Sequence, residues 1–283
     1  DEKDEGGVLI ALDWEKAFDS ISWDYLHASV EALGFGPDIQ RWYSILYNPY
    51  DPQQRTIQSN GKRSPSFSLF SGIPQGCPLS PLTFIFVSEA LTRLVKSSPN
   101  YKGINIAGRQ YRLSQFADDT LLFLRSYSGL RTAWRLIKQY SLATGMMVNM
   151  KKTEGIRCGR LKTHPPPIIP ELNTDLIQWV QPNKWVRLLG IPFWEAFDPS
   201  LFWDSLYHKA KGLMACWHTE FLTSLARSRV AVTMHLSRFR YWYQCMLPPQ
   251  YIQDAIDSDL QAFTWAKNLE MDPNEIGCSA KFR

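Results

Sequence analysis

Short apolar runs, separated by acidic and turn-forming residues, dominate the first half of the chain. Val8–Leu12 is apolar throughout and is followed directly by Asp13. The segment 111–124 has the composition of two strands, one on each side of an adjacent acid pair, Asp118 and Asp119. We therefore expect a central strand that ends at Asp13 and a hairpin whose turn holds the acid pair.

Apolar residues at helical spacing predict the helices of the chain. They indicate amphipathic helices at 21–32 and 130–144, the second ended by Gly145, and a further helix that begins near Pro81. The remaining expected segments are an extended proline-rich connection at 164–170, a short β segment near 178–193 and a helical region from about 201 to 268.

The three aspartates suggest metal chemistry. Two carboxylates held side by side between half-buried strands repel each other, so a fold that keeps both ionised usually neutralises them with a cation. Such oxygen ligands suit Mg²⁺, which takes one or two carboxylates and fills its other positions with water and substrate phosphate. With Asp13 facing the pair, two cations could support in-line displacement at phosphorus, as in phosphoryl or nucleotidyl transfer. The ordinary alternative is a solvated turn, because turns favour aspartate.

A loop rich in glycine and proline, residues 71–81, lies between these acidic positions. Its composition predicts a fixed conformation, and Pro81 suits the first turn of the following helix. Such a loop can bring its backbone and the Gln75 amide close to a nucleotide or a template base. Taken alone it is an ordinary helix start, so its meaning depends on its position between the two acidic strand ends.

In this order, the motifs resemble the palm of reverse transcriptases of LINE-type non-LTR retrotransposons. The chain carries Asp13 with Ala-Phe-Asp at 17–19, then Ile-Pro-Gln-Gly-Cys-Pro-Leu-Ser-Pro at 73–81, and then Ala-Asp-Asp at 117–119. The matching segments are motif A at 12–20, motif B at 72–81, motif C at 116–119, motif D at 145–153, a primer-grip hairpin at 185–191, thumb residues 217–240 and a closing helix at 262–265. The resemblance covers nearly the whole chain.

The resemblance implies an α+β fold, a polymerase palm with an antiparallel sheet and packed helices, followed by a helical thumb. It places the palm at 1–160, the proline-rich connection and primer-grip hairpin at 161–200, and the thumb at 201–283. It implies an RNA-directed DNA polymerase that transfers a nucleotide from dNTP to a primer 3′-hydroxyl on an RNA template. A nuclear, intracellular protein is expected from the same resemblance.

The resemblance also assigns catalytic roles. Asp13 and Asp118 would ligate two Mg²⁺ ions, or Mn²⁺, with Asp119 as a third carboxylate and the carbonyl after Asp13 as a further ligand. Lys152 matches the motif D lysine that protonates the departing pyrophosphate. Lys151 is the alternative at this position, and an exposed lysine pair is the ordinary interpretation of both.

Substrate contacts follow from motifs A and B. Phe18 matches the aromatic steric gate, a ring that collides with a ribose 2′-hydroxyl and so selects deoxynucleotides; core packing is the alternative role. Gln75 would touch the incoming nucleotide or the templating base, and Gly76 would let the backbone approach it.

Charge adds a candidate surface for nucleic acid. A net charge of +4 is small for a polynucleotide binder, so the basic residues must be concentrated to be effective. The predicted thumb is locally basic, and we expect Arg227, Arg229, Arg238 and Arg240 to contact phosphates of the template–primer duplex. The alternative is an amphipathic helical domain with solvated arginines. No apolar run approaches the roughly 18 residues that span a bilayer, so no membrane partner is expected.

Two other functional classes stay open at this point. The chain begins without methionine and reaches Asp13 almost at once. It therefore looks truncated, a palm-and-thumb portion without the fingers segment that precedes motif A in such polymerases. The second hypothesis is accordingly an inactive retroelement remnant that binds nucleic acid or a partner. A nuclease or phosphatase with two metals is the third, and the Gln75 loop and Phe18 disfavour it. The oligomeric state is not predicted.

Overall fold

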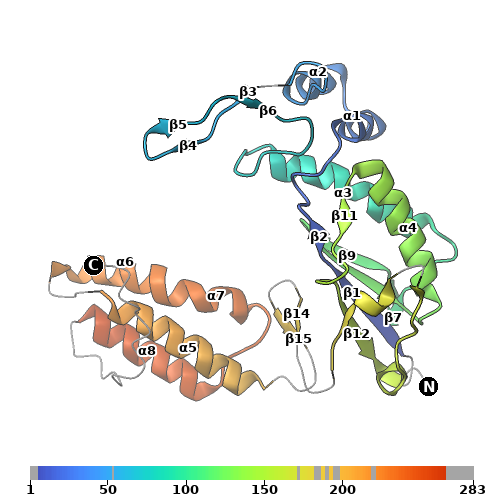
Figure 1. Cartoon of the computed structure of the whole chain (residues 1–283). Coiled ribbons are helices and arrows are strands. Elements are labelled where there is room, and N and C mark those ends of the chain that lie inside the picture. The colour runs from blue at the N-terminus through green and yellow to red at the C-terminus, as the bar shows by residue number, and fades with distance from the viewer. Residues whose placement is uncertain are drawn as a thin grey trace. The chain divides into compact units, whose positions relative to one another are not determined.

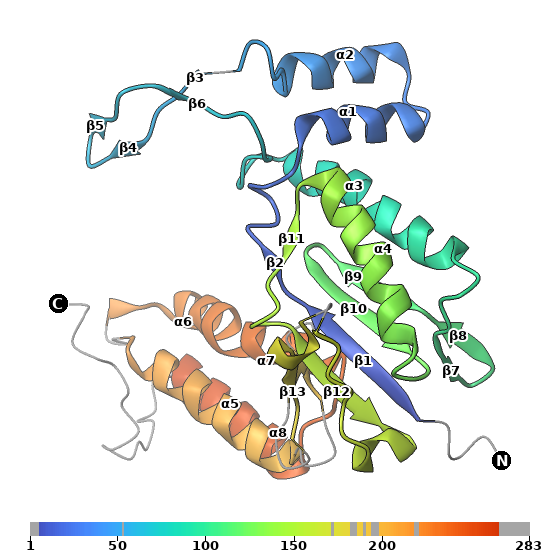
Figure 2. The same cartoon turned by 45° about the vertical axis from the view of Figure 1, so that its right-hand side comes forward.

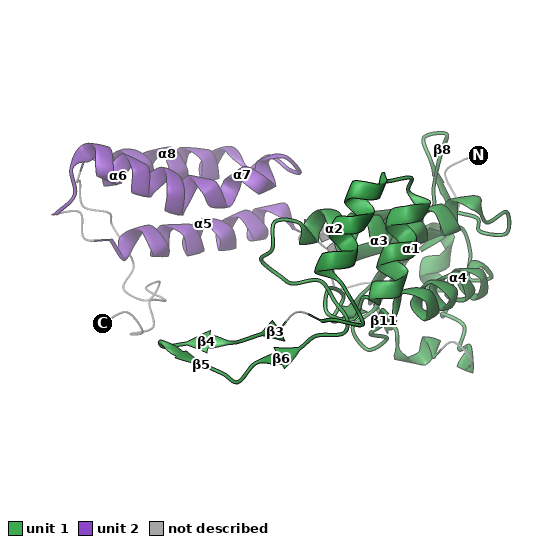
Figure 3. Ribbon diagram, turned by 90° about the horizontal axis from the view of Figure 1, so that it is seen from above, with its two compact units in different colours: residues 1–182 green, residues 183–283 purple. Residues whose placement is uncertain are grey.

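The chain folds into two compact units, residues 1–182 and 183–283, coloured separately in Figure 3. The computed structural model describes residues 6–52, 54–170, 173–181, 186–188, 191–193, 198–217 and 221–265.

A five-stranded sheet forms the centre of the first unit (Figure 1). The expected central strand is its middle strand, β1 (Gly7–Leu12), which pairs antiparallel with β10 (Asp119–Leu124) and with β12 (Glu154–Cys158). The outer strands are β9 (Leu113–Phe116), antiparallel to β10, and β13 (Gln178–Trp179), parallel to β12. The antiparallel palm-like sheet expected from the sequence is thus present.

Two helices lie along this sheet, and a third packs on them. In Figure 2, α3 (Ser80–Ser97) and α4 (Gly129–Thr144) lie beside the sheet, and α1 (Trp23–Ala32) packs against both of them beyond its end. Alternate residues of β1 and β10, among them Ile10 and Leu122, are fully buried in the core that the helices complete. The three predicted helices are confirmed, and Gly145 ends α4 in a left-handed conformation with φ of 80°.

No helix or strand was predicted from the sequence between α1 and α3, but the structure has a helix and a β-ribbon there. The first is α2 (Pro37–Leu46). The second is a narrow two-stranded ribbon, residues 54–68, which extends away from the helices of its unit (Figure 3). We call it the β3–β6 ribbon. Its strands are β3 (Gln54–Arg55), β4 (Gln58–Ser59), β5 (Lys62–Arg63) and β6 (Phe67–Ser68).

The shorter elements of the first unit complete its outline. The hairpin of β7 (Ile104–Ile106) and β8 (Arg109–Tyr111) precedes β9. Next to the sheet, β2 (Trp14–Glu15) pairs with β11 (Met147–Val148), which joins motif A to motif D. Two 3₁₀ segments, Gly159–Thr163 and Thr174–Leu176, lie in the connection after β12.

The second unit is helical after one hairpin. That hairpin, β14 (Val186–Leu188) and β15 (Ile191–Phe193), falls where the primer grip was expected; residues 185, 189 and 190 lie outside the described residues. Buried rings of Trp203 and Phe239 form the helical core. The helices are α5 (Pro199–Ala215), α6 (Ser224–Val230), the π-helical η6 (Ala231–Leu236), α7 (Ser237–Tyr243) and α8 (Gln250–Thr264). Over the described part of the chain, no helix is both long and apolar enough for a membrane span.

Candidate active site

The three aspartates meet where β1 ends and β10 begins. Leu12 lies opposite Thr120 in the strand register, so the next step along both strands brings Asp13 opposite Asp119. The turn between β9 and β10 has two residues, Ala117 and Asp118, because Phe116 and Asp119 still pair. Asp118 therefore lies in the turn, whereas Asp119 is the first residue of β10. The expectation that both acids occupy the turn is wrong for Asp119.

The carboxylates are within electrostatic reach of one another. Partial burial, and then the negative charges of Asp118 and Asp13, raise the pKa of the Asp119 carboxyl above its ordinary value. Asp118 and Asp119 are exposed, and Asp13 is half-buried. Negative charge therefore collects at an accessible edge of the sheet, where a bound cation would relieve the repulsion.

The donor chemistry of this edge fits Mg²⁺. Carboxylate oxygens are the hard ligands that this ion prefers, and it needs only one or two of them when water and substrate phosphate supply the rest. Among the described residues, no group of three or more acidic, histidine or cysteine side chains is close enough to hold a metal ion. Oxygen ligands for the other positions of a bound ion would have to come from water or substrate.

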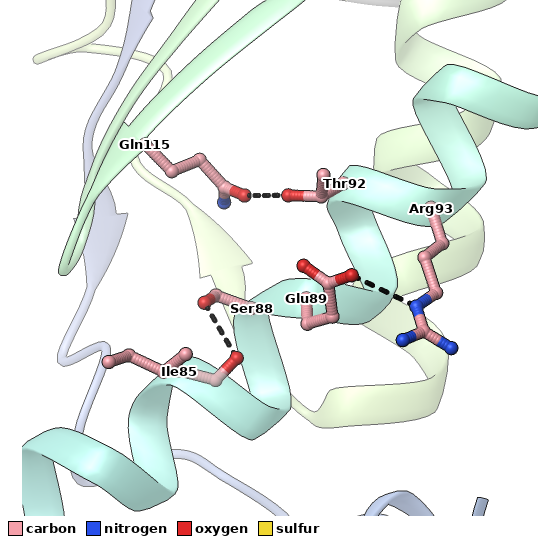
Figure 4. A network of polar contacts seen from close by, with 6 residues as sticks. All are labelled: Ile85, Ser88, Glu89, Thr92, Arg93 and Gln115. Carbon is pink, nitrogen blue, oxygen red and sulfur yellow. Dashed lines mark hydrogen bonds and ion pairs between the residues drawn. The ribbon is translucent and has the colours of Figure 1, made fainter. Parts of the chain in front are cut away.

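A chain of hydrogen bonds lies beneath the acidic turn. The Thr120 hydroxyl accepts from Trp14 Nε1 at 3.2 Å and from Gln115 Nε2 at 3.3 Å, and it donates to the Asp118 carbonyl at 3.4 Å. Gln115 Oε1 in turn accepts from the Thr92 hydroxyl of α3 at 2.6 Å (Figure 4). This chain connects the turn that carries Asp118 to motif A and to α3.

The same helix carries a solvent-side pair next to this connection. Figure 4 shows Arg93 reaching Glu89 one turn earlier on α3, with Nε and Oε1 2.9 Å apart. Both side chains are well exposed, so this ion pair contributes little to stability. Thr92 on the same turn is the residue that reaches the sheet.

Motif D holds the backbone of Asp13. Asn149 donates its backbone N–H to the Asp13 carbonyl at 2.8 Å, and the Asp13 N–H points to the Thr153 hydroxyl at 3.5 Å. The Thr153 hydroxyl donates to the Asn149 carbonyl, which closes the turn between them. Lys152 and Lys151 are exposed residues of this turn, so the structure does not select between them. Both belong to a segment that is anchored directly on Asp13.

Motif B is hydrogen-bonded to motif A around Phe18. The Phe18 carbonyl accepts from Ile73 N–H at 2.7 Å, and Gly72 N–H donates to the Ile21 carbonyl at 2.7 Å. The Phe18 ring is half-buried and stacks on Phe84 of α3, with ring centres 4.6 Å apart. Phe18 thus packs against the core while its backbone is fixed by the motif B loop. Its position is compatible with both roles considered for it.

The two glycines of motif B serve different purposes. Gly72 has φ of 82°, and a β-carbon there would lie 2.6 Å from the Asp19 carbonyl oxygen. Gly76 also has positive φ, 84°, but a β-carbon there would have no other atom of the described residues within 4 Å. Gln75 and Gly76 are exposed at the tip of the loop. The loop therefore presents an accessible backbone, held at its base by the Ser80 hydroxyl, which donates to the Pro74 carbonyl at 2.6 Å.

The four predicted thumb arginines belong to the second unit and do not form one stripe. Residues two apart on a helix differ by about 200° in direction, so Arg227 and Arg229 leave α6 on different sides, as do Arg238 and Arg240 on α7. Arg227 is half-buried, and its Nε donates to the Leu222 carbonyl at 3.0 Å. Arg229, Arg238 and Arg240 are exposed and available to a polyanion.

Trp14, Thr92, Gln115 and Thr120 were not identified as site residues from the sequence. Trp14 and Thr120 directly follow two of the aspartates, which is the only signal the sequence offers for them. Their contacts join positions up to 106 residues apart, as between Trp14 and Thr120, and so appear only once the strands are paired.

Comparisons with known proteins identify the family of the chain. Residues 1–193 match the family model described as reverse transcriptase (RNA-dependent DNA polymerase). The chain belongs to the reverse transcriptase family. A Xenopus laevis protein described as the transposon TX1 uncharacterized 149 kDa protein is 26% identical over 91% of this chain and 19% of its own length. The LINE-type resemblance of the motifs is confirmed by this match and by those to R2 elements.

The R2 relatives match a shorter stretch. The Pol polyprotein from the Drosophila melanogaster retrotransposable element R2DM is 29% identical over 52% of this chain, and one from a Popillia japonica R2 element is 27% identical over the same share. Among solved structures, the telomerase of Candida tropicalis is similar with a TM-score of 0.46 and 11% identity over 94% of this chain and 44% of its own. The chain spans only 13–20% of the length of the three curated relatives.

Proposed function

We propose that this chain carries the catalytic palm of an RNA-directed DNA polymerase, which adds deoxynucleotides to a primer 3′-hydroxyl on an RNA template. The observation that carries the proposal is the meeting of Asp13, Asp118 and Asp119 at the ends of β1 and β10, in a chain of the reverse transcriptase family. The exposure of this acidic edge leaves it accessible to a triphosphate.

Asp13 and Asp118 would hold Mg²⁺ in this proposal, with Asp119 beside them. When bound, the two ions supply activation of the primer hydroxyl and stabilisation of the leaving pyrophosphate. Hydrogen bonds from motif D and from Thr120 fix the backbones of Asp13 and Asp118, which keeps both carboxylates in place for the substrate. Lys152 is the proposed proton donor to pyrophosphate, and it extends from the turn anchored on Asp13.

Selection of the nucleotide is assigned to Phe18, Gln75 and Gly76. The exposed motif B tip would contact the incoming nucleotide or the templating base through Gln75, with Gly76 allowing close approach of the backbone. The hydrogen bond from Ile73 N–H to the Phe18 carbonyl supports this assignment, because it connects the proposed sugar-contacting residue to the proposed base-contacting loop.

The sugar gate has a direct test. Phe18→Val should increase the use of ribonucleotides relative to deoxynucleotides by roughly tenfold or more, because the smaller side chain leaves room for the 2′-hydroxyl. The measurement is the ratio of kcat/KM for dGTP and GTP in single-nucleotide extension. Phe84→Leu is the matched control, since it disturbs the same ring stack from the core side. An unchanged ratio in a folded Phe18 variant would assign Phe18 to packing alone.

The proposed reaction is tested by extension of a DNA primer on an RNA template with Mg²⁺ and deoxynucleotides. Asp118→Asn should abolish extension, whereas Asp175→Asn, an exposed acid in the 3₁₀ segment at 174–176, should leave it unchanged. Template binding without extension by the unaltered protein would favour the inactive nucleic-acid binder. Cleavage of the template or release of phosphate that depends on Asp118 would favour a hydrolytic enzyme with two metals.

A further inference from the structure

The β3–β6 ribbon is basic and carries no compensating acid. It contains Arg55, Lys62 and Arg63, and the chain has no aspartate or glutamate between Asp51 and Glu89. Within the described part of the chain, none of these three basic side chains forms an ion pair. The ribbon therefore concentrates three positive charges in a protein whose net charge is only +4.

The ribbon also exposes apolar side chains. Ile57 and Phe67 have exposed fractions of 62% and 39%, and Phe70, two residues after the ribbon ends, has 66%. Two strands alone cannot bury their side chains against each other. The ribbon also extends away from the helices of its own unit (Figure 3). In the register of the ribbon, Arg55 lies directly opposite Phe67, so a cation and an aromatic ring share one face.

The ribbon is a defined structure with a fixed tip. Asn60 and Gly61 both have positive φ, 49° and 76°, as a tight two-residue hairpin turn requires. Ser64 donates its N–H to the Ile57 carbonyl at 2.9 Å and accepts from the Ile57 N–H through its hydroxyl at 3.0 Å. Lys62 and Arg63 follow the turn directly and are neighbours on one strand, so they make both faces of the tip basic.

The base of the ribbon lies next to the motif B loop. Cys77 of that loop has a thiol pKa below its ordinary value, first because of a backbone hydrogen bond from Leu79 and also because of the positive charge of Arg55. Arg55 is therefore within electrostatic reach of the loop that carries Gln75 and Gly76. The basic ribbon therefore begins near the motif B loop and ends at a tip that carries Lys62 and Arg63.

Building on the proposed function, we propose that the β3–β6 ribbon binds the single-stranded part of the RNA template beside the palm. Phosphates would contact Arg55, Lys62 and Arg63, and unpaired bases would stack on Phe67 and Phe70. A duplex offers no free base faces to these rings, because its bases are already stacked and paired. The combination of unpaired cations and exposed rings therefore favours a single strand.

Fluorescence anisotropy with a 20-nucleotide oligouridylate tests the proposal, in EDTA and without deoxynucleotides. In the triple variant Arg55→Gln, Lys62→Gln and Arg63→Gln, we expect affinity at about 100 mM salt to fall at least tenfold. The slope of log K against log salt should decrease by about 2, since each lost contact with a single strand removes roughly 0.7. Because no synthesis is measured, failure here is separable from failure of the polymerase. Asp175→Asn, the exposed control in the 3₁₀ segment at 174–176, should bind like the unaltered protein.

A matched control removes the same charge elsewhere in the first unit. Lys96, Lys102 and Lys138 are exposed and lie outside the ribbon, and replacing all three with glutamine also lowers the net charge by three. This control should change the slope by less than half as much as the ribbon variant. Equal effects of both variants would show a general charge effect and overturn the proposal.

The rings have their own test. Phe70→Ala should weaken binding of the oligouridylate by roughly tenfold with an unchanged salt slope, because stacking involves no phosphate charge. Leu142→Ala, a similarly exposed apolar residue on α4, should have no effect. A larger loss for a 20-base-pair RNA duplex than for the single strand would overturn the single-strand assignment. Unchanged binding in the ribbon variants, with lost self-association by sedimentation velocity, would assign the ribbon to contacts between copies.

Discussion

Thr120 has one hydroxyl group with three partners, which makes it the residue most closely tied to the acidic turn. Thr120→Val keeps the shape but removes the acceptor for Trp14 and Gln115 and the donor to the Asp118 carbonyl. We expect the free energy of unfolding to fall by about 1–3 kcal/mol, the usual cost of unpaired buried polar groups. The rate of nucleotide addition should fall about tenfold, because Asp118 is no longer held.

Two variants separate positioning from general stability. Thr120→Ser keeps the hydroxyl and should restore most of the rate. Thr83→Val removes another buried threonine hydroxyl, which lies away from the acidic turn and is hydrogen-bonded to the Tyr43 hydroxyl at 2.8 Å. This variant should lower stability without slowing nucleotide addition. Urea unfolding and the separate values of kcat and KM in primer extension are the measurements. A Thr120→Val enzyme with normal kcat would limit Thr120 to a structural role.

Asp119 is expected to oppose folding at neutral pH. Because burial and the nearby carboxylates raise its pKa, the folded protein holds a proton there more tightly than the unfolded chain does. This contribution favours folding at low pH and is lost as the pH rises through the raised pKa. Asp119→Asn should therefore raise Tm at pH 7 in EDTA by a small amount, on the order of 1–2 °C, with no gain near pH 3.

The metal dependence completes this test. Mg²⁺ should stabilise the unaltered protein more than Asp119→Asn, because the cation relieves the same repulsion that the substitution removes. Thermal unfolding between pH 3 and pH 8, with and without Mg²⁺, gives both results. If Asp119→Asn lowers Tm at neutral pH, the carboxylate is held by favourable contacts and the repulsive interpretation fails.

At the residue scale, sequence predicted the ends of strands better than the contacts between them. Asp13 follows an apolar run and Asp118 precedes one, so their meeting follows from the pairing of two short strands. The exact position of the turn was not predicted, because the turn has only two residues and Asp119 already belongs to the strand. Hydrogen bonds of Thr120 depend on the register of three strands, which local pattern does not specify.

At the scale of elements, the motif B loop separates two uses of glycine. Gly72→Ala should lower the free energy of unfolding by about 2 kcal/mol or more, because its β-carbon would collide with the Asp19 backbone as well as requiring positive φ. Gly76→Ala should cost about 1 kcal/mol, for the backbone conformation alone. Urea unfolding of both variants makes the comparison.

Activity then tests the proposed substrate approach at Gly76. If nucleotides come close to this backbone, Gly76→Ala should raise KM for deoxynucleotides several-fold despite its small effect on folding. Gly108→Ala in the turn between β7 and β8 is the matched control, since it also has positive φ and open space around it. An unchanged KM in the Gly76 variant would remove Gly76 from the substrate contacts.

The elements missed from sequence lie between motifs A and B. Helix α2 is only ten residues long, and it exposes Trp42 and Ile45, so its apolar pattern does not mark a buried face clearly. The ribbon has strands of two residues, too short for an alternating pattern. Its one sequence signal is Asn60-Gly61, the dipeptide typical of tight hairpin turns. By contrast, α4 has a long amphipathic pattern and a glycine stop, and it was predicted almost to the residue.

At the scale of the whole molecule, positive charge is gathered in both units. The first unit carries it on the β3–β6 ribbon, and the second carries it on α6 and α7. The sequence indicated that the basic residues of the thumb outnumber its acids, but not which of them are accessible. Side-chain contacts supply that distinction, because Arg227 uses its guanidinium within its own unit.

Arg227 should therefore differ from the exposed arginines in its effect on nucleic-acid binding. Replacing Arg229, Arg238 and Arg240 with glutamine should weaken binding to a primed RNA template regardless of sequence, since phosphate contacts carry no base identity. The salt slope should decrease by roughly one unit for each lost phosphate contact. Arg227→Gln should instead lower the free energy of unfolding by about 1 kcal/mol, through its lost bond to Leu222, with the slope unchanged.

Binding isotherms at several salt concentrations, together with urea unfolding, distinguish the two classes. Extension by the triple variant should recover partly at low salt or at high template concentration, because the acidic edge belongs to the other unit and is not altered. An unchanged slope in the triple variant would show that Arg229, Arg238 and Arg240 form only a solvated helix surface. Under that result, the salt dependence of template binding would have to arise from the first unit, where the ribbon cations are the next residues to neutralise.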